Sequence, residues 1–417
     1  MSGSEEPRAQ PAQVRTRAFS AAGRDLRLFI IAGEHSGDAL GAELMAAMNE
    51  RRRGRIRYLG VGGQAMAARG LVSQFAIEDV AVMGPGAILR RLPLIMRRIR
   101  STSAAVVAAD PDALVIIDSP EFTHRIASSV RRRRPGIPII DYVAPSVWAW
   151  RPVRARKMRG YIDHVLALLP FEPEAYRRLS GPPCSYVGHP LIERLAWLRA
   201  LDGEPLARRL ALSPDAAVLV VLPGSRASEV GRLMGPFGAA IGELLAQDRS
   251  IEIITPVVEA VRGLIEEGLK AWPKRPHLIS GEADKFRAFK LARAALAASG
   301  TVTLELAVSG IPTVAASRVA AWEAAIIRRI IRVPSIILAN LVIGENIVPE
   351  FLQENCVPAR LAEALISLLD GPARRRQLDA FQKLDAVMGS GTMRPSDEAA
   401  AAVLALVEQN NRPPTWS

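Results

Sequence analysis

The stretch AVLVVLPGSRASE, residues 217–229, decides the fold of this chain. Its first six residues are continuously apolar, as in a strand that is buried on both faces of a parallel sheet. Pro223 and Gly224 end this apolar run, and residues 228–246 follow with the spacing of an amphipathic helix. A strand, a glycine loop and a helix in this order form the repeating unit of an α/β protein.

The same unit recurs along most of the chain. Strand-like runs occupy residues 28–32, 114–118, 138–142 and 164–169, and again 217–222, 251–255, 294–298, 312–316 and 335–338. Helical patterns lie between them, at residues 38–52, 88–100, 228–246 and 301–309. This alternation predicts two doubly wound, Rossmann-like α/β domains, with ligands bound at the strand ends in the cleft between the domains.

A break at residues 201–205, LDGEP, separates the two predicted domains. The N-terminal domain is expected over residues 25–200 and the C-terminal domain over residues 205–390. Residues 1–24 are expected to form a disordered tail, and residues 391–417 a terminal helix that packs across the domains. A length of 417 residues agrees with a chain of two or three domains.

Composition places the chain among globular proteins. With 49% hydrophobic and 23% charged residues, disordered, collagen-like and fibrous classes are excluded. Its two cysteines, Cys184 and Cys356, form no disulfide framework, which fits a reducing cytoplasm. No signal peptide pattern is present, and no run reaches the ~18 apolar residues of a membrane span. Any membrane contact is therefore expected to be peripheral.

The formal net charge of +12 is carried mainly by arginine, which supplies 48 of the 54 basic residues. Codon bias in a GC-rich genome accounts for part of this excess. A basic surface attracts phosphates, nucleic acids or anionic membranes. No nucleic acid partner is expected, because the chain has no recognisable binding module and no basic strand interleaved with aromatic residues.

One loop of the second half offers the groups that a diphosphate needs. Gly224 and Ser225 end a strand, and Arg226 stands at the start of the next helix. Backbone N–H groups, the helix dipole and a guanidinium therefore converge on one place. The loop lacks the Gly-Lys-[Ser/Thr] ending of a Walker A motif.

A second loop in the same half repeats this pattern. Ser299, Gly300 and Thr301 end one strand and open another helix, which makes a second anion-sized turn. Glu305 follows one helical turn later, where its carboxylate suits a ribose diol. The alternative is a capping box in which Thr301 is the N-cap.

Two polar loops follow strands in the first half. Residues 33–38, GEHSGD, lead directly into a helix, and their glycines allow close backbone approach. The alternative is a plain turn with Ser36 or Asp38 as the N-cap. Asp118 ends a fully apolar strand, where a carboxylate faces the cleft and can act as a general base. Capping of the following helix explains Asp118 equally well.

No spacing in the chain is typical of a metal site. The five histidines are scattered, and the Asp-Pro-Asp at residues 110–112 precedes its strand, at the wrong edge of the sheet. We predict a turn there, and neither a metal ion nor a cofactor.

Residues 88–98, ILRRLPLIMRR, interleave bulky apolar side chains with arginines. This pattern is typical of a segment that lies on anionic lipid, and equally of a helix packed on its own domain. The arginines concerned are Arg90, Arg91, Arg97 and Arg98. Trp148 and Trp150, just beyond a strand, either line a substrate wall or fill the domain junction.

Taken together, these motifs resemble those of the lipid-A-disaccharide synthase family of inverting glycosyltransferases. The resemblance runs from about residue 28 to the end of the chain. Its markers in order are AGEHSGD (32–38), GVGGQAM (60–66), VMG (82–84), DSP (118–120), residues 142–150, LLPFE (168–172), VGHP (187–190), residues 222–230, residues 299–305 and VPEFLQ (348–353). Each marker is weak, but the full set in this order is highly specific.

The resemblance implies a glycosyltransferase fold of the B type. It implies transfer from UDP-2,3-diacylglucosamine to the 6-hydroxyl of 2,3-diacylglucosamine 1-phosphate (lipid X), in the cytoplasm at the inner membrane, with a homodimer left open. Asp118 is the implied base. The implied UDP-sugar-binding residues are Gly224, Ser225, Arg226, Ser299, Gly300, Thr301, Glu305, Asn340 and Gln353. The implied acceptor-side residues are Gly33, Glu34, Ser36, Gly37, Asp38 and Met83.

The chain departs from the family pattern at a few positions. The usual Asp-Ala-Pro-Asp-Phe reads DSPEF at residues 118–122, Glu345 replaces an arginine, and Ser317 stands where a tyrosine is usual. The charge reversal at Glu345 bears on donor affinity or acyl-chain preference more than on the class of reaction. The alternatives are another UDP-sugar enzyme of this fold, such as a 2-epimerase, and a catalytically silent paralogue.

Overall fold

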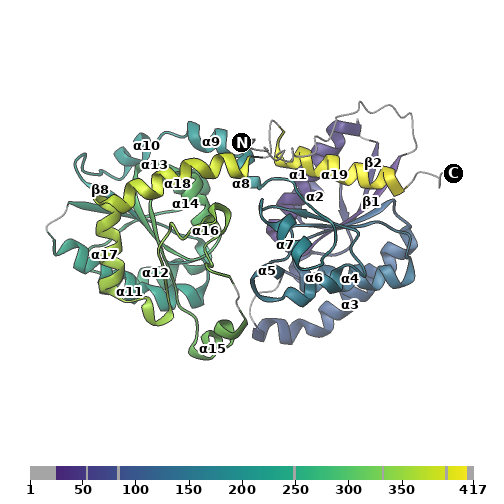
Figure 1. Cartoon of the computed structure of the whole chain (residues 1–417), viewed down its shortest axis with the longest axis horizontal. Coiled ribbons are helices and arrows are strands. Elements are labelled where there is room, and N and C mark those ends of the chain that lie inside the picture. The colour runs from purple at the N-terminus through teal and green to yellow at the C-terminus, as the bar shows by residue number, and fades with distance from the viewer. Residues whose placement is uncertain are drawn as a thin grey trace, which may run out of the picture.

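Two parallel sheets lie side by side in the computed structural model, each with helices on both faces (Figure 1). The structure describes residues 25–52, 55–81, 85–247, 250–330, 333–389 and 393–410. The first sheet has seven strands in the order β3-β2-β1-β4-β5-β6-β7, and the second has six in the order β10-β9-β8-β11-β12-β13. Both orders are doubly wound, so the predicted fold class is confirmed.

The N-terminal unit is built around β1. Its strands are β1 (Leu26–Ala32), β2 (Ile56–Val61), β3 (Val72–Ser73), β4 (Ala113–Ile117), β5 (Ile139–Tyr142), β6 (His164–Ala167) and β7 (Cys184–Tyr186). Its helices are α1 (His35–Arg52), α2 (Gln64–Ala67), α3 (Pro85–Ala109), α4 (Pro120–Arg133), α5 (Val147–Trp150), α6 (Pro152–Met158), α7 (Glu172–Arg178), α8 (Pro190–Glu193) and α9 (Leu195–Ala200), with a 3-10 turn η1 (Ile77–Asp79).

The C-terminal unit is built around β8. Its strands are β8 (Ala217–Leu222), β9 (Ile251–Pro256), β10 (His277–Ile279), β11 (Ala292–Ala298), β12 (Thr313–Ser317) and β13 (Glu350–Leu352). Its helices are α10 (Glu204–Arg209), α11 (Ala227–Leu245), α12 (Arg262–Gly268), α13 (Glu282–Leu291), α14 (Val302–Val308), α15 (Ala321–Ile330), α16 (Leu338–Ile343), α17 (Pro358–Leu369) and α18 (Pro372–Met388). Short 3-10 turns are η2 (Glu259–Val261), η3 (Leu269–Ala271) and η4 (Gln353–Asn355).

Burial on both faces explains the continuous apolar runs. Val218 and Val220 of β8 pack into the core on one face of the second sheet, and Leu219 and Val221 into the core on the other. Successive strand residues point to opposite faces, so every position of such a strand must be apolar.

The strand predicted at residues 335–338 is absent, and α16 begins there instead. The hydroxyl of Ser335 accepts hydrogen bonds from the backbone N–H of Ile337, at 3.0 Å, and from the side-chain amide of Asn340, at 3.1 Å. Local bonds of this kind compete with strand pairing and favour a helix start. The sixth strand, β13, lies further along the chain.

The last described helix, α19 (Pro395–Asn410), returns to the N-terminal unit after α18 (Figure 1). It packs on α1 and α8, and Val403 and Leu404 join the buried core around Leu28. The Ser396 hydroxyl donates to Glu193 of α8 at 2.7 Å. The first strand and the last described helix therefore belong to one unit. Within the described ranges, no helix is both long and apolar enough to cross a membrane.

Candidate active site

A pocket of about 780 Å³ lies at the carboxyl ends of β8, β9 and β11. Ligands of doubly wound sheets bind at this edge. Seven of the nine residues predicted to bind the UDP-sugar line it together: Gly224, Ser225, Arg226, Ser299, Gly300, Thr301 and Glu305. Both predicted loops thus form one site, because both follow neighbouring strands of one sheet.

The loop after β8 is shaped by a glycine and a carboxylate. Gly224 has φ +120°, and a Cβ there would come within 2.7 Å of the Glu229 side chain, so only glycine fits without strain. Glu229 accepts the Ser225 N–H at 3.2 Å and forms an ion pair with Arg226 at 3.0 Å. The exposed Arg226 guanidinium is thereby held at the pocket wall, beside the start of α11.

Helix α13 brings to this pocket a lysine that the sequence pattern does not single out. Lys285 of α13 forms an ion pair of 2.8 Å with Glu305 of α14. The Thr301 side chain makes no capping hydrogen bond to the start of α14, so the capping box considered as the alternative does not form. Of the residues that the structure describes, two cations stand in the pocket wall, Arg226 and Lys285. Its four carboxylates, which are acceptors for hydroxyl and ring N–H groups, are Glu229, Glu259, Glu282 and Glu305.

Asn340 and Gln353 are not part of this pocket wall. Asn340 is only 2% exposed, and its amide oxygen accepts the N–H groups of Ile347, at 3.1 Å, and Val348, at 2.8 Å. The side-chain amide of Gln353 bonds to the backbone of Val319. Both amides hold the chain between β12 and β13 in shape. Their implied role at the nucleotide stays a prediction.

Asp118 lies in a strained turn directly after β4. Asp118 and Ser119 both adopt left-handed backbone conformations, with φ +54° and +46°. Each such residue costs about 1–3 kcal/mol, and this strain is concentrated at functional sites. One Asp118 oxygen accepts the Ser119 N–H at 2.7 Å, and the other lies 3.5 Å from the hydroxyl of Ser36. The carboxylate is half-buried and faces the start of α1.

The predicted acceptor-side loop is seated against this turn. A Cβ on Gly33 would overlap the Ser119 side chain, so the close approach of the two loops requires glycine. The Ser119 hydroxyl donates to Glu34 at 3.0 Å, and Gly37 is buried beside the end of β4. The structure therefore brings Gly33, Glu34, Ser36 and Gly37 together with Asp118. Met83 lies outside the described residues.

Asp38 has a different environment from the rest of its loop. It is 5% exposed, and its carboxylate accepts the backbone N–H groups of Gly63 (2.7 Å), Ala65 (3.0 Å) and Met66 (3.1 Å). These are the first N–H groups of α2, which have no partner within their own helix. Asp38 therefore joins α1 to α2 from inside the protein.

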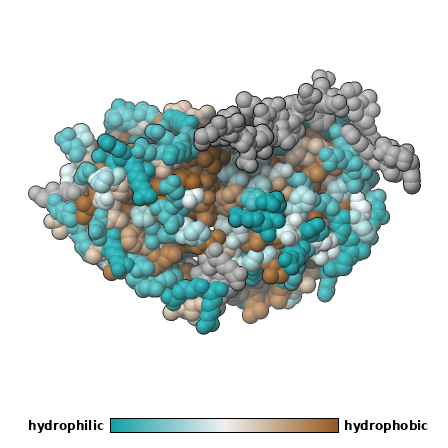
Figure 2. Space-filling model, in the orientation of Figure 1, coloured by the Kyte–Doolittle hydropathy of each residue, from teal (hydrophilic) through white to brown (hydrophobic). Residues whose placement is uncertain are grey.

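The two tryptophans have separate environments. The indole N–H of Trp148 donates to Glu172 at 3.1 Å, and the ring packs edge-on against Phe171 at 4.9 Å. Both rings pack against a buried apolar cluster that joins residues of the two units, among them Leu169 and Ile347, so Trp148 lies in the junction. Apolar side chains gather there between the two halves in Figure 2. Trp150 is 41% exposed and lies in another groove.

Glu172 makes the stability of this junction depend on pH. Burial raises its pKa to about 7, although the Trp148 indole and the Leu169 N–H favour the charged form. The stabilising contribution of the protonated group is complete below about pH 4.5 and is lost as the pH rises through about 7. The variant Glu172→Gln cannot ionise at this position. In urea unfolding from pH 5 to pH 8, its free energy of unfolding should therefore rise relative to that of the wild type, by up to about 3 kcal/mol at the highest pH. A pH-independent difference would contradict this assignment.

The arginines of α3 fall into two groups. Arg98 forms an ion pair with Asp79 at 2.6 Å and lies over the Phe75 ring, and Arg91 donates to the Glu78 carbonyl at 2.7 Å. These two hold α3 on its own unit. Arg90 and Arg97 are exposed and form no ion pair within the described ranges. Beside them, Leu89 is 72% exposed and Leu92 is 41% exposed.

The two facing α/β units, with a pocket at the strand ends, have the arrangement of the B-type glycosyltransferase fold. Similar solved structures have this arrangement. The UDP-GlcNAc 2-epimerase from Neisseria meningitidis bound to UDP-GlcNAc has a TM-score of 0.61 at 12% identity, over 92% of this chain and 100% of that one. The calicheamicin glycosyltransferase CalG4 has a TM-score of 0.53 at 19% identity, over 94% of this chain and 100% of that one. At such identities the likeness shows the fold alone.

The model of the lipid-A-disaccharide synthetase family matches residues 28–403 of this chain. The chain therefore belongs to the lipid-A-disaccharide synthase family, and it is a glycosyltransferase of lipid A biosynthesis. The lipid-A-disaccharide synthase of Rhodopseudomonas palustris strain HaA2 is 56% identical over 92% of this chain and 97% of its own. The lipid-A-disaccharide synthase of Rhodospirillum centenum is 45% identical over 92% of this chain and 95% of its own length. The family predicted from the motifs is confirmed.

Proposed function

We propose that this chain transfers the sugar of UDP-2,3-diacylglucosamine to the 6-hydroxyl of 2,3-diacylglucosamine 1-phosphate (lipid X), with inversion and without a metal ion. The acceptor oxygen attacks the anomeric carbon as the bond from that carbon to the diphosphate breaks, and the acceptor proton passes to a base. The products are the β-1,6-linked disaccharide 1-phosphate and UDP. The observation that carries the proposal is the strained Asp118 turn, packed against the loop at residues 33–37.

Asp118 is the proposed base. Its carboxylate is half-buried at a strand end, beside Ser36 and the exposed Glu34. A base at this edge of the first sheet can reach an acceptor hydroxyl in the cleft. The left-handed backbone at Asp118 and Ser119 supports a functional role, since strain of this size persists only where the surrounding structure holds it.

The pocket at β8, β9 and β11 is the proposed UDP site. Arg226 and Lys285 are its cations, and Arg226 stands beside the start of the 19-residue helix α11. They favour the charge that develops on the leaving diphosphate. Glu305 and Glu282 are acceptors suited to the hydroxyls of ribose.

The test of the reaction is direct. Purified chain is incubated with UDP-2,3-diacylglucosamine and lipid X, and the products are separated and weighed by mass spectrometry. Disaccharide 1-phosphate and UDP in equal amounts are expected. If UDP binds but no disaccharide forms, the catalytically silent paralogue suggested by Glu345 and Ser317 is the correct interpretation.

Arg226→Ala should weaken UDP binding by about 10- to 100-fold, because a charge-assisted hydrogen bond contributes about 1.5–3 kcal/mol. Titration calorimetry with UDP measures this change. Arg232→Ala is the matched control, because Arg232 lies on the same helix and does not line the pocket. Equal UDP affinity in wild type and Arg226→Ala would remove Arg226 from the diphosphate site.

We also propose that the protein acts in the cytoplasm, bound peripherally to the anionic inner membrane through the first turns of α3. Leu89 and Leu92 are exposed beside Arg90 and Arg97. Apolar side chains next to cations suit the boundary between acyl chains and anionic headgroups. Both proposed substrates carry acyl chains, so a membrane-bound enzyme meets them where they reside.

Replacing Leu89 and Leu92 together by serine should reduce sedimentation with phosphatidylglycerol vesicles by about tenfold, because the apolar area that enters the interface is lost. Val72→Ser is the control, since Val72 is 80% exposed but lies on β3. Unchanged sedimentation of the double variant would exclude α3 as the membrane contact.

A further inference from the structure

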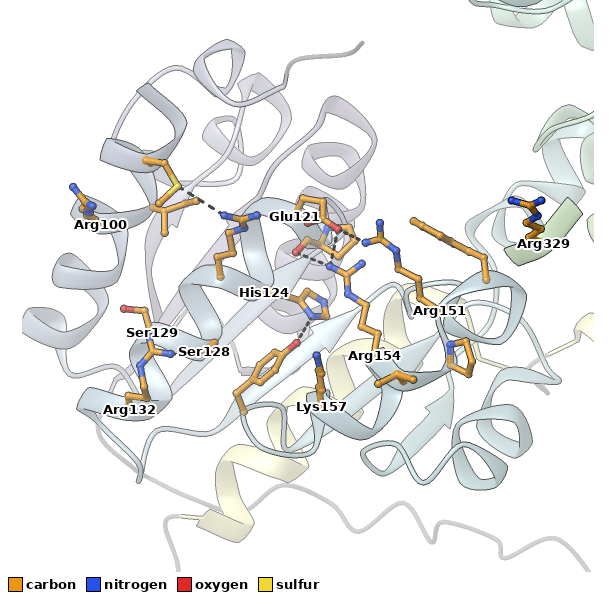
Figure 3. Close-up of a pocket in the computed structure, with 18 residues that line it drawn as sticks. Arg100, Glu121, His124, Ser128, Ser129, Arg132, Arg151, Arg154, Lys157 and Arg329 are labelled. Carbon is orange, nitrogen blue, oxygen red and sulfur yellow. Dashed lines mark hydrogen bonds and ion pairs between the residues drawn. The ribbon is translucent and has the colours of Figure 1, made fainter. Parts of the chain in front are cut away.

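A groove of about 1170 Å³ lies between α3, α4 and α6 (Figure 3). It is separate from the pocket of the C-terminal unit. It begins at Pro120 and Glu121, next to the Asp118 turn, and extends along the outer side of α4 as far as Arg132. Figure 3 shows Arg329 reaching toward it from the ribbon of the other unit.

The charge of this groove is strongly one-sided. Among the described residues, seven cationic side chains line it: Arg100, Arg125, Arg132, Arg151, Arg154, Lys157 and Arg329. Glu121 is the one carboxylate in this described lining, and it binds Arg151 at 3.1 Å and Arg154 at 2.9 Å. Burial acts to raise the pKa of Glu121, but these arginines outweigh it and hold the pKa below its usual value. Glu121 therefore stays charged, and its carboxylate is bound by Arg151 and Arg154.

Several of the remaining cations have no acidic partner of their own. Within the described part of the chain, Arg100, Arg132 and Lys157 form no ion pair, and Arg125 lies near Glu121, which Arg151 and Arg154 already bind. Arg132 donates to the Ser128 hydroxyl at 3.2 Å, and Arg125 lies 3.9 Å from the Met96 sulfur. The helix dipole favours Arg132 in the last turn of α4, but it does not explain Arg125 or Arg100 in helix interiors. Their mutual repulsion is relieved by an anion.

An apolar stripe leads into the same groove along α3. Leu89, Leu92, Met96 and Ile99 follow one another at spacings of three, four and three residues, so they share one side of the helix. The first two are exposed, and the last two line the groove. A ligand with an anionic head and an apolar tail can therefore use both the groove and the stripe.

We propose that this groove binds the phosphate group of an acylated lipid, with acyl chain lying along the α3 stripe. Guanidinium groups recognise phosphate oxygens through paired, charge-assisted hydrogen bonds. The phosphate can come from two lipids. The first is lipid X, the acceptor of the proposed function, and for this lipid the inference rests on that function. An anionic phospholipid of the membrane carries the same chemistry and is the second source.

Neighbouring residues provide a charge-matched test. Arg132 and Lys157 line the groove, whereas Arg133 and Arg156, next to them on α4 and α6, are exposed outside its lining. The variant Arg132→Glu/Lys157→Glu is compared with Arg133→Glu/Arg156→Glu, which has the same net charge. Lipid X binding is measured by calorimetry in neutral detergent micelles, and vesicle binding by sedimentation with phosphatidylcholine alone or mixed with phosphatidylglycerol.

The groove variant should bind at least one of these lipids about tenfold or more weakly than its control, with UDP affinity and melting temperature unchanged. Loss confined to lipid X identifies the acceptor phosphate, and loss confined to phosphatidylglycerol vesicles identifies a membrane headgroup. Equal binding by the two variants in both measurements overturns the proposal. Because both measurements report binding, a wild type that binds lipid X without transferring sugar contradicts the proposed function alone.

Discussion

Asp118→Asn should lower kcat by roughly a thousandfold while leaving the affinity for UDP unchanged, because the loss of a general base costs about 10²–10⁴ in rate. Asparagine keeps the shape of the side chain and can still accept the Ser119 N–H that Asp118 accepts at 2.7 Å. It also tolerates the left-handed backbone of this position better than alanine does. The substitution therefore removes basicity and little else.

Asp110 offers a close control for this experiment. It is an aspartate at the opposite end of β4, it also has a left-handed backbone with φ +43°, and it forms an ion pair with Arg134. Asp110→Asn should retain wild-type turnover. Steady-state kinetics and UDP calorimetry on both variants decide between the roles of Asp118. A fall in UDP affinity and melting temperature along with kcat would make Asp118 a structural residue, and a kcat near wild type would exclude it as the base.

The pocket at the second sheet could be predicted because its residues follow the strands that form it. Gly224 to Arg226 come directly after β8, and Ser299 to Thr301 directly after β11. Strand ends of one parallel sheet meet at one edge, so sequence position is enough to bring these loops together. Lys285 was missed because its partner Glu305 is 20 residues away, on a different helix.

Buried polar residues and the cationic groove show where sequence reasoning stops. The sequence predicts Asn340 as a residue of the nucleotide site, but its amide oxygen accepts the backbone N–H groups of Ile347 and Val348. The groove draws on helices α3, α4, α5 and α6 and on Arg329 from the other unit, so no local motif describes it. The spacing of the arginines at residues 131–134 indicates only a basic helix end, where cations complement the helix dipole.

Asp38→Ala should destabilise the N-terminal unit by about 3–4 kcal/mol, the largest stability change that we expect from a single substitution in this site. Asp38 is buried and accepts three backbone N–H groups, and each hydrogen bond to a charged group contributes about 1.5–3 kcal/mol. Removing the carboxylate leaves the start of α2 without acceptors in a place that water reaches poorly. For a unit of this size the melting temperature should fall by roughly 10 °C.

A graded series separates this structural role from one in acceptor binding. One Asp38 oxygen accepts the N–H groups of both Gly63 and Met66, so Asp38→Asn can keep two of the three bonds and should lose less stability than Asp38→Ala. Glu43→Ala is the control, because Glu43 lies on α1 and forms only a loose, exposed ion pair of 3.8 Å with Arg69. Thermal unfolding without substrates measures all three. If Asp38→Ala melts at the wild-type temperature but binds lipid X weakly, the carboxylate serves the acceptor and the bonds to α2 contribute little.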